Sequence, residues 1–386
     1  MRPEVYDELR QEAIDSAPTN WRCVSFPSAG PSSSSAVSTE ASPVLDGVLY
    51  LRSPNGSGPW MVMANANGVC YEEIMLEASS LHGAATSLLL FNYRGVGRST
   101  GVPLRGDDLV DDVLGAIAFL GSEFGVAPED VMLYGHSMGG GAVALARAAC
   151  GPAGTFVSDR SFASLAAVVP HHLRSGPMAL IVGLFVAVLA AVLGMLFSST
   201  TDSLGPWVAA WTVACWLGMA YAISDLVANN AASIPRDKLP HWWASLAAHT
   251  SHRTVAFATL SVPFLLAAAP LFLALAHFGA LAPLGSRLIV AFGWKLDAAT
   301  AWKAVSGPRL LFYHELDEMI NFDHCSLYAA LAADPSSGFD PARHAVKGLV
   351  VTRLASNGPF FHMYPVAKDP NASLLLSRME AMRESR

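Results

Sequence analysis

The stretch VMLYGHSMGGG at residues 131–141 joins an apolar strand to a helix of small residues through the turn Gly-His-Ser-Met-Gly. Such a turn in this setting is typical of a nucleophile elbow, where strained backbone exposes a serine hydroxyl above a sheet. Gly135 and Gly139 keep side chains away from neighbouring elements. Because the motif alone recurs by chance, its flanking strand and helix decide the interpretation. We predict Ser137 as a nucleophile and the N–H of Met138 as an oxyanion donor.

The composition combines few charges with a large apolar fraction. Of the 386 residues, 14% are charged and 52% hydrophobic, and the mean hydropathy is +0.38. Soluble proteins are about one quarter charged, so we expect part of the chain to lie in lipid. The net charge of -7 argues against nucleic-acid binding. Widely spaced cysteines indicate neither a disulfide framework nor a zinc site, and His249 and His252 lack a third ligand. The sequence implies no metal and no cofactor.

Strands and helices alternate through the first part of the chain. Residues 2–16 indicate a polar amphipathic helix, and residues 27–43, rich in Ser, Pro and Ala, indicate a loop. Strands are predicted at 21–26, 48–52, 60–64, 87–93 and 131–134, and helices at 71–81 and 107–124. Strands that are apolar on both faces and alternate with helices predict a mostly parallel α/β sheet flanked by helices.

The composition changes abruptly near residue 165. Residues 178–198 and 206–224 carry no charge, and each run is long enough to cross a bilayer, which predicts a transmembrane helical hairpin. A third uncharged run, 254–286, is broken by prolines. The α/β pattern then resumes with a strand at 309–314, a helix at 325–333 and a last strand at 347–354. The predicted organisation is an N-terminal segment (1–43), a first core part (44–170), a hydrophobic helical insertion acting as cap or membrane segment (171–300), and a second core part (301–386).

A serine nucleophile needs a base, and the base needs an acid that orients it. In this kind of sheet the chain order is serine, acid, histidine. Asp317 follows the strand at 309–314 and is the predicted acid, with Glu315 and Glu318 as alternatives. His362 follows the last strand and is the predicted base. Two other histidines, His344 before that strand and His324 after the acid, are less well placed to meet Ser137.

A second oxyanion donor is expected from the turn after the strand at 60–64. The sequence Asn65-Ala-Asn67-Gly68 supplies that turn, with the N–H of Asn67 as the predicted donor; the alternative is an ordinary Asn-Gly loop. We place Asn65, Gly68 and His136 among the predicted substrate-binding residues. The later Gly-x-Gly at 95–97 lacks the spacing of a dinucleotide site, and we expect Arg94 to be held there by local hydrogen bonds.

These motifs together resemble the α/β-hydrolase superfamily over about residues 44–170 and 300–366. The segments NANGVCYE (65–72), YRGVGRSTG (93–101), GHSMGG (135–140) and SDRSF (158–162) are more specifically similar to a poorly characterised group of hydrolases seen in chlamydia-like and Legionella-like bacteria. The resemblance implies Ser137, Asp317 and His362 as a catalytic triad and names no substrate. The apolar insertion departs from the superfamily pattern, in which a soluble helical cap is usual.

The triad constrains the path of the insertion, because Ser137 precedes the apolar runs while Asp317 and His362 follow them. The number of membrane crossings must therefore be even. We expect the hairpin at 178–224 to span, and the run at 254–286 to lie in the interface, re-enter or cover the site as a lid. The alternative is a wholly soluble cap that buries a lipid tunnel.

Two features favour a membrane location with the catalytic domain facing the cytosol. The N-terminus lacks the apolar run of a secretory signal, and basic residues flank the hairpin outside its turn. These residues are Arg174, Arg236, Lys238 and Arg253, with Asp202 alone in the turn.

The leading hypothesis is a membrane-associated serine hydrolase that cleaves an ester, thioester or amide of an apolar small-molecule or lipid acyl substrate through an acyl-serine intermediate. A serine peptidase of the prolyl-oligopeptidase type is a second candidate, although no propeller-length N-terminal domain is present. A catalytically silent membrane scaffold that keeps the hydrolase fold is the third.

Overall fold

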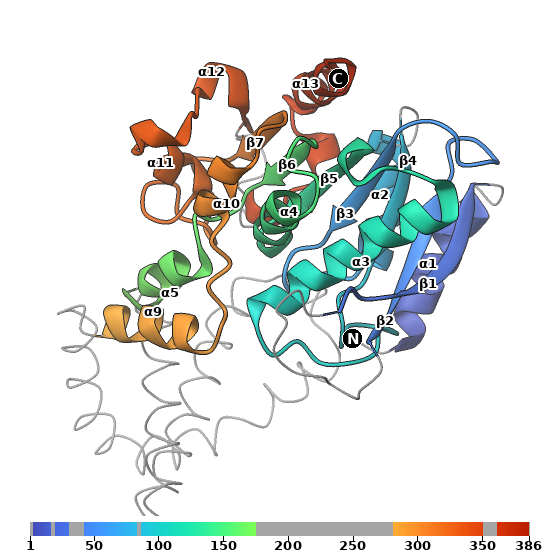
Figure 1. The fold of residues 1–386 in the computed structure, drawn as a ribbon, viewed down its shortest axis with the longest axis horizontal. Helices are drawn as coiled ribbons and strands as arrows, with labels where there is room; N and C mark the ends of the chain where they lie inside the picture. The colour runs from blue at the N-terminus through green and yellow to red at the C-terminus, as the bar shows by residue number, and fades with distance from the viewer. Residues whose placement is uncertain are drawn as a thin grey trace, which may run out of the picture. The chain divides into compact units, whose positions relative to one another are not determined.

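A mixed β-sheet forms the centre of the described part of the chain (Figure 1). The computed structural model describes residues 3–16, 20–30, 42–82, 86–174, 281–349 and 361–385. The strand order is β1-β2-β4-β3-β5-β6-β7-β8, and β2 runs antiparallel to both of its neighbours while the other neighbours pair in parallel. The strands are β1 (Trp21–Pro27), β2 (Val44–Tyr50), β3 (Trp60–Ala64), β4 (Ser87–Phe91), β5 (Val131–His136), β6 (Phe156–Asp159), β7 (Arg309–Tyr313) and β8 (Ala345–Lys347).

Helices cover both faces of this sheet (Figure 1). One face carries α3 (Gly106–Phe124), α4 (Met138–Ala149) and α10 (Ala298–Ala304), and the other carries α1 (Pro3–Ser16), α2 (Tyr71–His82) and α13 (Ala372–Glu384). The remaining helices are α5 (Leu165–Arg174), α9 (Leu281–Ala291), α11 (Leu327–Ala332) and α12 (Pro341–His344). The expected mostly parallel sheet flanked by helices is thereby confirmed.

The apolar strands supply two separate cores because successive side chains point to opposite faces. In β3, Val62 belongs to the core under α3 and α4, whereas Met61 and Met63 belong to the core under α1 and α2. Leu89 and Leu90 divide in the same way in β4. Strands buried on both faces must be apolar throughout, which explains why they read as continuous apolar runs in the sequence.

Several predicted element boundaries differ from the structure. The predicted strand at 60–64 coincides with β3, but β6 does not appear among the predicted strands. The last strand was placed at 347–354, whereas β8 is Ala345–Lys347. The N–H of Leu349 turns to the carboxylate of Asp369 (3.3 Å) instead of continuing the ladder, and residues 350–354 lie outside the described residues.

The chain divides into two units, Met1–Val169 with Ser286–Arg386, and Pro170–Gly285. Residues 286–300, which we had assigned to the insertion, thus belong to the α/β unit, where α10 buries Trp302. The predicted spans 178–198 and 206–224, and most of the run 254–286, lie outside the described residues. Within the described ranges, every helix is too short or too polar to cross a membrane.

Candidate active site

The turn between β5 and α4 holds Ser137 in an unusual backbone conformation. Its φ of 54° and ψ of -115° lie in a region that residues with a side chain rarely occupy. A Cβ on Gly135 would lie 2.2 Å from the carbonyl oxygen of Gly139, and a Cβ on Gly139 would lie 2.1 Å from that of Ala64. Only glycine fits at either position, so the motif spacing is a steric requirement of the elbow.

The structure brings Ser137, His362 and Asp317 together. Ser137 lies 2.8 Å (Oγ) from Nε2 of His362, and Nδ1 of His362 lies 2.8 Å from Oδ2 of Asp317. Since a carboxylate only accepts, Nδ1 carries the imidazole proton and Nε2 is left to accept the proton of the serine hydroxyl. All three side chains are buried. This is the geometry that a general base needs toward a nucleophile.

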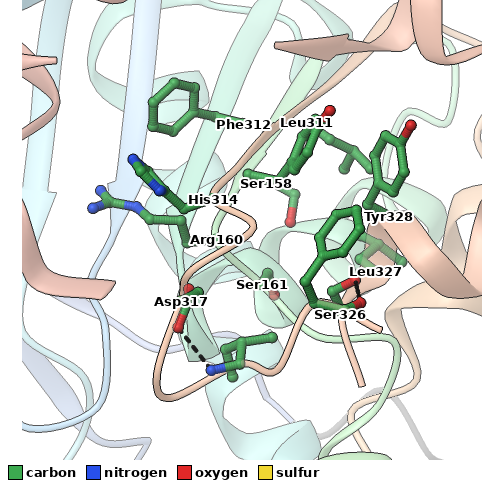
Figure 2. Close-up of a pocket in the computed structure, with 13 residues that line it drawn as sticks. Ser158, Arg160, Ser161, Leu311, Phe312, His314, Asp317, Ser326, Leu327 and Tyr328 are labelled. Atoms are coloured by element: carbon green, nitrogen blue, oxygen red, sulfur yellow. Dashed lines mark hydrogen bonds between the residues drawn. The ribbon is translucent and has the colours of Figure 1, made fainter. Parts of the chain in front are cut away.

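The acid is fixed by its own loop. Oδ1 of Asp317 accepts hydrogen bonds from the backbone N–H groups of Met319 (2.9 Å) and Ile320 (2.7 Å). Figure 2 shows Asp317 with a dashed line to its carboxylate. These bonds aim the second carboxylate oxygen at His362. The loop follows directly from β7, so the register of the sheet determines where the carboxylate lies.

The alternative acids and bases lie elsewhere. Glu318 accepts the backbone N–H of His362 at 3.3 Å, and Glu315 forms an exposed ion pair with Lys347. His344 packs against the ring of Trp302. His324, the remaining alternative, is exposed, and its N–H donates to Asn321.

A segment after β6 connects the nucleophile to the histidine. The carbonyl of Asp159 accepts the N–H of Ser137 (2.8 Å), and the hydroxyl of Ser161 donates to the carbonyl of Ser137 (2.7 Å). Between them, Arg160 donates through Nη1 to the carbonyl of Tyr364 (2.6 Å), two residues beyond His362. In the sequence this segment contributes only to the family resemblance, and no role is predicted for it.

Arg160 and Asp159 form a buried ion pair beneath the site. Nε and Nη2 of Arg160 donate to the two carboxylate oxygens of Asp159 at 2.6 and 2.8 Å, and the hydroxyl of Tyr134 donates to the same carboxylate at 2.8 Å. Burial alone would raise the pKa of Asp159, but the charge of Arg160 and these hydrogen bonds hold it below its ordinary value. The pair therefore stays ionised inside the protein.

His136 supports the backbone of the histidine. Burial, followed by the charge of Arg160, lowers the pKa of His136 to about 3, so its ring is neutral at neutral pH. Its Nε2–H donates to the carbonyl of His362 at 2.8 Å. With Glu318 holding the N–H of His362, both backbone polar groups of that residue have a partner. We had predicted a substrate-binding role for His136, and this contact is one that the sequence did not indicate.

The predicted oxyanion donors lie on two neighbouring elements. Met138 is the first residue of α4, so its N–H has no acceptor within the helix. Asn67 and Gly68 are exposed in a turn after β3 that is closed by a hydrogen bond from Val69 to Ala66 (3.3 Å). The buried amide of Asn65 donates to the carbonyl of Phe91 (3.2 Å). That bond ties the turn to the end of β4.

Two smaller features complete the surroundings. Arg94 is held by hydrogen bonds to the carboxylate of Asp112 (2.9 Å) and the hydroxyl of Ser28 (2.7 Å), which come from other parts of the chain and not from its own loop. A cavity of about 10 Å³ lies beside Arg160 and Asp317 (Figure 2), which is too small for an acyl chain. Among the described residues, no group of three His, Cys, Asp or Glu side chains is placed to hold a metal ion.

The strand order, the elbow and the order serine, acid, histidine define an α/β-hydrolase fold. No protein-family model matches the chain. Two uncharacterized proteins of Mycobacterium tuberculosis strains are 33% identical over 161 residues, which is 39% of this chain. The match spans 57% of the length of these curated relatives.

Three solved structures show a limited similarity to the chain. The α/β hydrolase GrgF from Penicillium sp. has a TM-score of 0.47 at 14% identity, covering 95% of this chain and 98% of its own. An esterase from Pyrococcus furiosus has a TM-score of 0.39 at 13% identity, covering 80% of this chain and 76% of its own. An α/β hydrolase from Vibrio vulnificus has a TM-score of 0.34 at 21% identity, covering 42% and 55%.

Proposed function

We propose that the protein is a serine hydrolase that cleaves an ester, thioester or amide of an apolar acyl substrate. The observation that carries the proposal is the continuous hydrogen-bond path from Ser137 through His362 to Asp317. A serine hydroxyl becomes a competent nucleophile only when a base can take its proton, and this path supplies the base in the required tautomer.

The proposed reaction proceeds in two halves. Oγ of Ser137 bonds to the substrate carbonyl carbon while its proton passes to Nε2 of His362, and the charge of Asp317 stabilises the imidazolium. The N–H groups of Met138 and Asn67 are the proposed donors to the oxyanion. The bond to the leaving group breaks as His362 returns the proton to it. Water then adds to the acyl-serine, with His362 as base, and releases the acid.

The proposed acyl preference rests on the side chains next to the catalytic groups. Leu316 and Met319 flank Asp317, Met363 follows His362, and all three are exposed. Large exposed apolar side chains next to the proposed catalytic residues favour contact with an apolar ligand. The uncharged runs at 178–198 and 206–224 support membrane association as part of the same proposal.

Labelling with a fluorophosphonate probe tests the nucleophile. We expect the full chain to be labelled, Ser137→Ala to lose the label, and the matched control Ser122→Ala, an exposed serine on α3, to keep it. Labelling that persists in Ser137→Ala would contradict the proposed nucleophile. Absence of labelling in the parent protein would favour the silent scaffold.

Two further measurements address the substrate and the membrane. Turnover of p-nitrophenyl esters is expected to rise with acyl length and to exceed turnover of peptide amides; the reverse preference would favour a peptidase. Alkaline carbonate extraction of cell membranes is expected to leave the protein in the pellet. Full release into the supernatant would contradict integral membrane association.

A further inference from the structure

A large groove lies at the end of the sheet opposite the candidate active site. It has a volume of about 810 Å³ and is bounded by the start of β7, by α12 and by one face of α13. Arg309 begins β7, whereas Asp317 follows the other end of that strand, so the groove and the acid are separated by at least the strand's length, roughly 13 Å. The volume falls within the range typical of small-molecule sites.

Three arginines line this groove, one from each boundary. The guanidinium of Arg309 lies 4.9 Å from the ring centre of Trp302, and its Nη1 donates to the carbonyl of Val305. Nη1 of Arg378 donates to the carbonyls of Ala342 (2.7 Å) and Arg343 (3.0 Å) at the end of α12. These contacts hold the guanidinium groups of Arg309 and Arg378 in the groove. The third arginine of the groove, Arg343, is exposed.

The three arginines differ from most others in the described part of the chain in having no acidic partner. Among the described residues, no ion pair joins Arg309, Arg343 or Arg378 to an acid, although the whole chain carries a net charge of -7. Burial lowers the pKa of Arg309, and the nearby positive charge of Arg343 lowers it further. An anion placed between them would relieve this repulsion.

His344 adds a neutral hydrogen-bond donor to the groove, on α12. The backbone N–H of Asp340 donates to Nδ1 of His344 at 2.9 Å, which leaves the imidazole hydrogen on Nε2. Burial, then Arg309 and Arg343, lower the pKa of His344, while the carboxylate of Asp340 opposes the shift. That carboxylate accepts the N–H of Ala342 at 3.0 Å.

We propose that this groove binds a phosphate-bearing ligand, held by Arg309, Arg343 and Arg378. Guanidinium groups recognise phosphate oxygens through two parallel N–H donors, and a cluster of them suits a group with more than one negative charge. Leu374 and Met382 line the α13 side and supply apolar contact for the remainder of the ligand. The ligand is either a soluble phosphate compound or the headgroup of a phospholipid, since both carry the same chemistry.

Isothermal titration of the full chain with inorganic pyrophosphate tests the site. We expect saturable binding that weakens about tenfold or more in Arg343→Gln. This variant removes an exposed side chain, so folding is preserved, which circular dichroism verifies. The matched control Arg22→Gln, an exposed arginine on β1 paired with Glu123, keeps the parental affinity. Equal binding by all three proteins, or no saturable binding, would overturn the proposal.

Vesicle sedimentation separates the two sources of phosphate. Binding to phosphatidylcholine vesicles that increases with added phosphatidic acid, falls in Arg343→Gln and is competed by pyrophosphate identifies a lipid headgroup. Pyrophosphate binding without this dependence identifies a soluble ligand. Fluorophosphonate labelling of Ser137 is expected to be unchanged in Arg343→Gln, so the groove is tested independently of the proposed hydrolase activity.

Discussion

Removing the guanidinium of Arg160 tests how the candidate site is held together. Arg160 and Asp159 are both almost fully buried, and the arginine also binds the carbonyl of Tyr364 near His362. Arg160→Met keeps much of the apolar volume but leaves the carboxylate of Asp159 without its counter-charge. Among the residues that the structure describes, the hydroxyl of Tyr134 is then the remaining side-chain donor to that carboxylate.

The expected loss is large because one ion is left unpaired in the interior. Breaking a buried ion pair by removing one partner lowers the free energy of unfolding by about 3–5 kcal/mol, against a total of roughly 5–15 kcal/mol for a typical domain. The double variant Asp159→Asn with Arg160→Met removes the stranded charge. We expect it to recover at least about half of the loss.

The pH dependence has a defined sign. The folded protein holds the pKa of Asp159 below its ordinary value, so the pair stabilises the fold above about pH 4 and this contribution is lost as the pH falls through the lowered pKa. In Arg160→Met, burial raises the pKa instead. The difference in free energy of unfolding between the parent and Arg160→Met is therefore largest at neutral pH and becomes smaller in acid.

Urea unfolding followed by circular dichroism measures these free energies, and the rate of fluorophosphonate labelling reports the position of His362. We expect slower labelling in Arg160→Met under conditions where the variant remains folded. A loss below about 1 kcal/mol, or a double variant no more stable than the single one, would refute the reasoning, because either result means that Asp159 is not left as a buried unpaired charge.

Changes at three other positions have expected outcomes. Asn67→Pro is expected to lower the ester hydrolysis rate about 100-fold or more, because proline suits that turn position but removes the N–H. Asn67→Ala retains the N–H, so an equal loss there would point to the side chain. Ser137→Gly is expected to be about 1 kcal/mol more stable than Ser137→Ala in urea, because glycine relieves the positive φ; equal stability would argue against strain. Burial lowers the pKa of His82 to about 4. The neutral ring therefore makes its full contribution to the free energy of unfolding above about pH 6.5, and this contribution falls in acid by on the order of 3 kcal/mol below pH 4. His82→Phe should flatten this decline in acid unfolding curves, and an unchanged slope would assign it to other groups.

The sequence was most informative at positions where the reaction or the available space allows only one type of residue. The elbow requires glycine at two positions and a serine between them, so Ser137 could be found by motif. Asp317 could be placed because β7 is a clear apolar run and the acid follows it. The strand β3 was predicted with its observed bounds because a strand buried on both faces must be an unbroken apolar run.

The supporting contacts were not predictable because they depend on the order of strands in the sheet. The strand β6 has four residues, too few for a periodic pattern, and the polar segment after it resembles an ordinary surface loop. Only its position between β5 and β7 places Arg160 beside both the elbow and the segment of His362. His136 was likewise assigned to substrate because nothing local indicates that its ring supports the carbonyl of His362.

The two ends of the insertion are joined within the α/β unit. The N–H of Leu165 donates to the carbonyl of Lys295 (2.9 Å), and the hydroxyl of Ser286 donates to the carbonyl of Ala166 (2.6 Å). The strands on either side, β6 and β7, are paired neighbours in the sheet. The intervening chain therefore leaves and returns at one place on the same side of the sheet. If it enters a bilayer it must cross an even number of times, so a protease-protection experiment that placed Ser137 and His362 on opposite sides of a membrane would be incompatible with this fold.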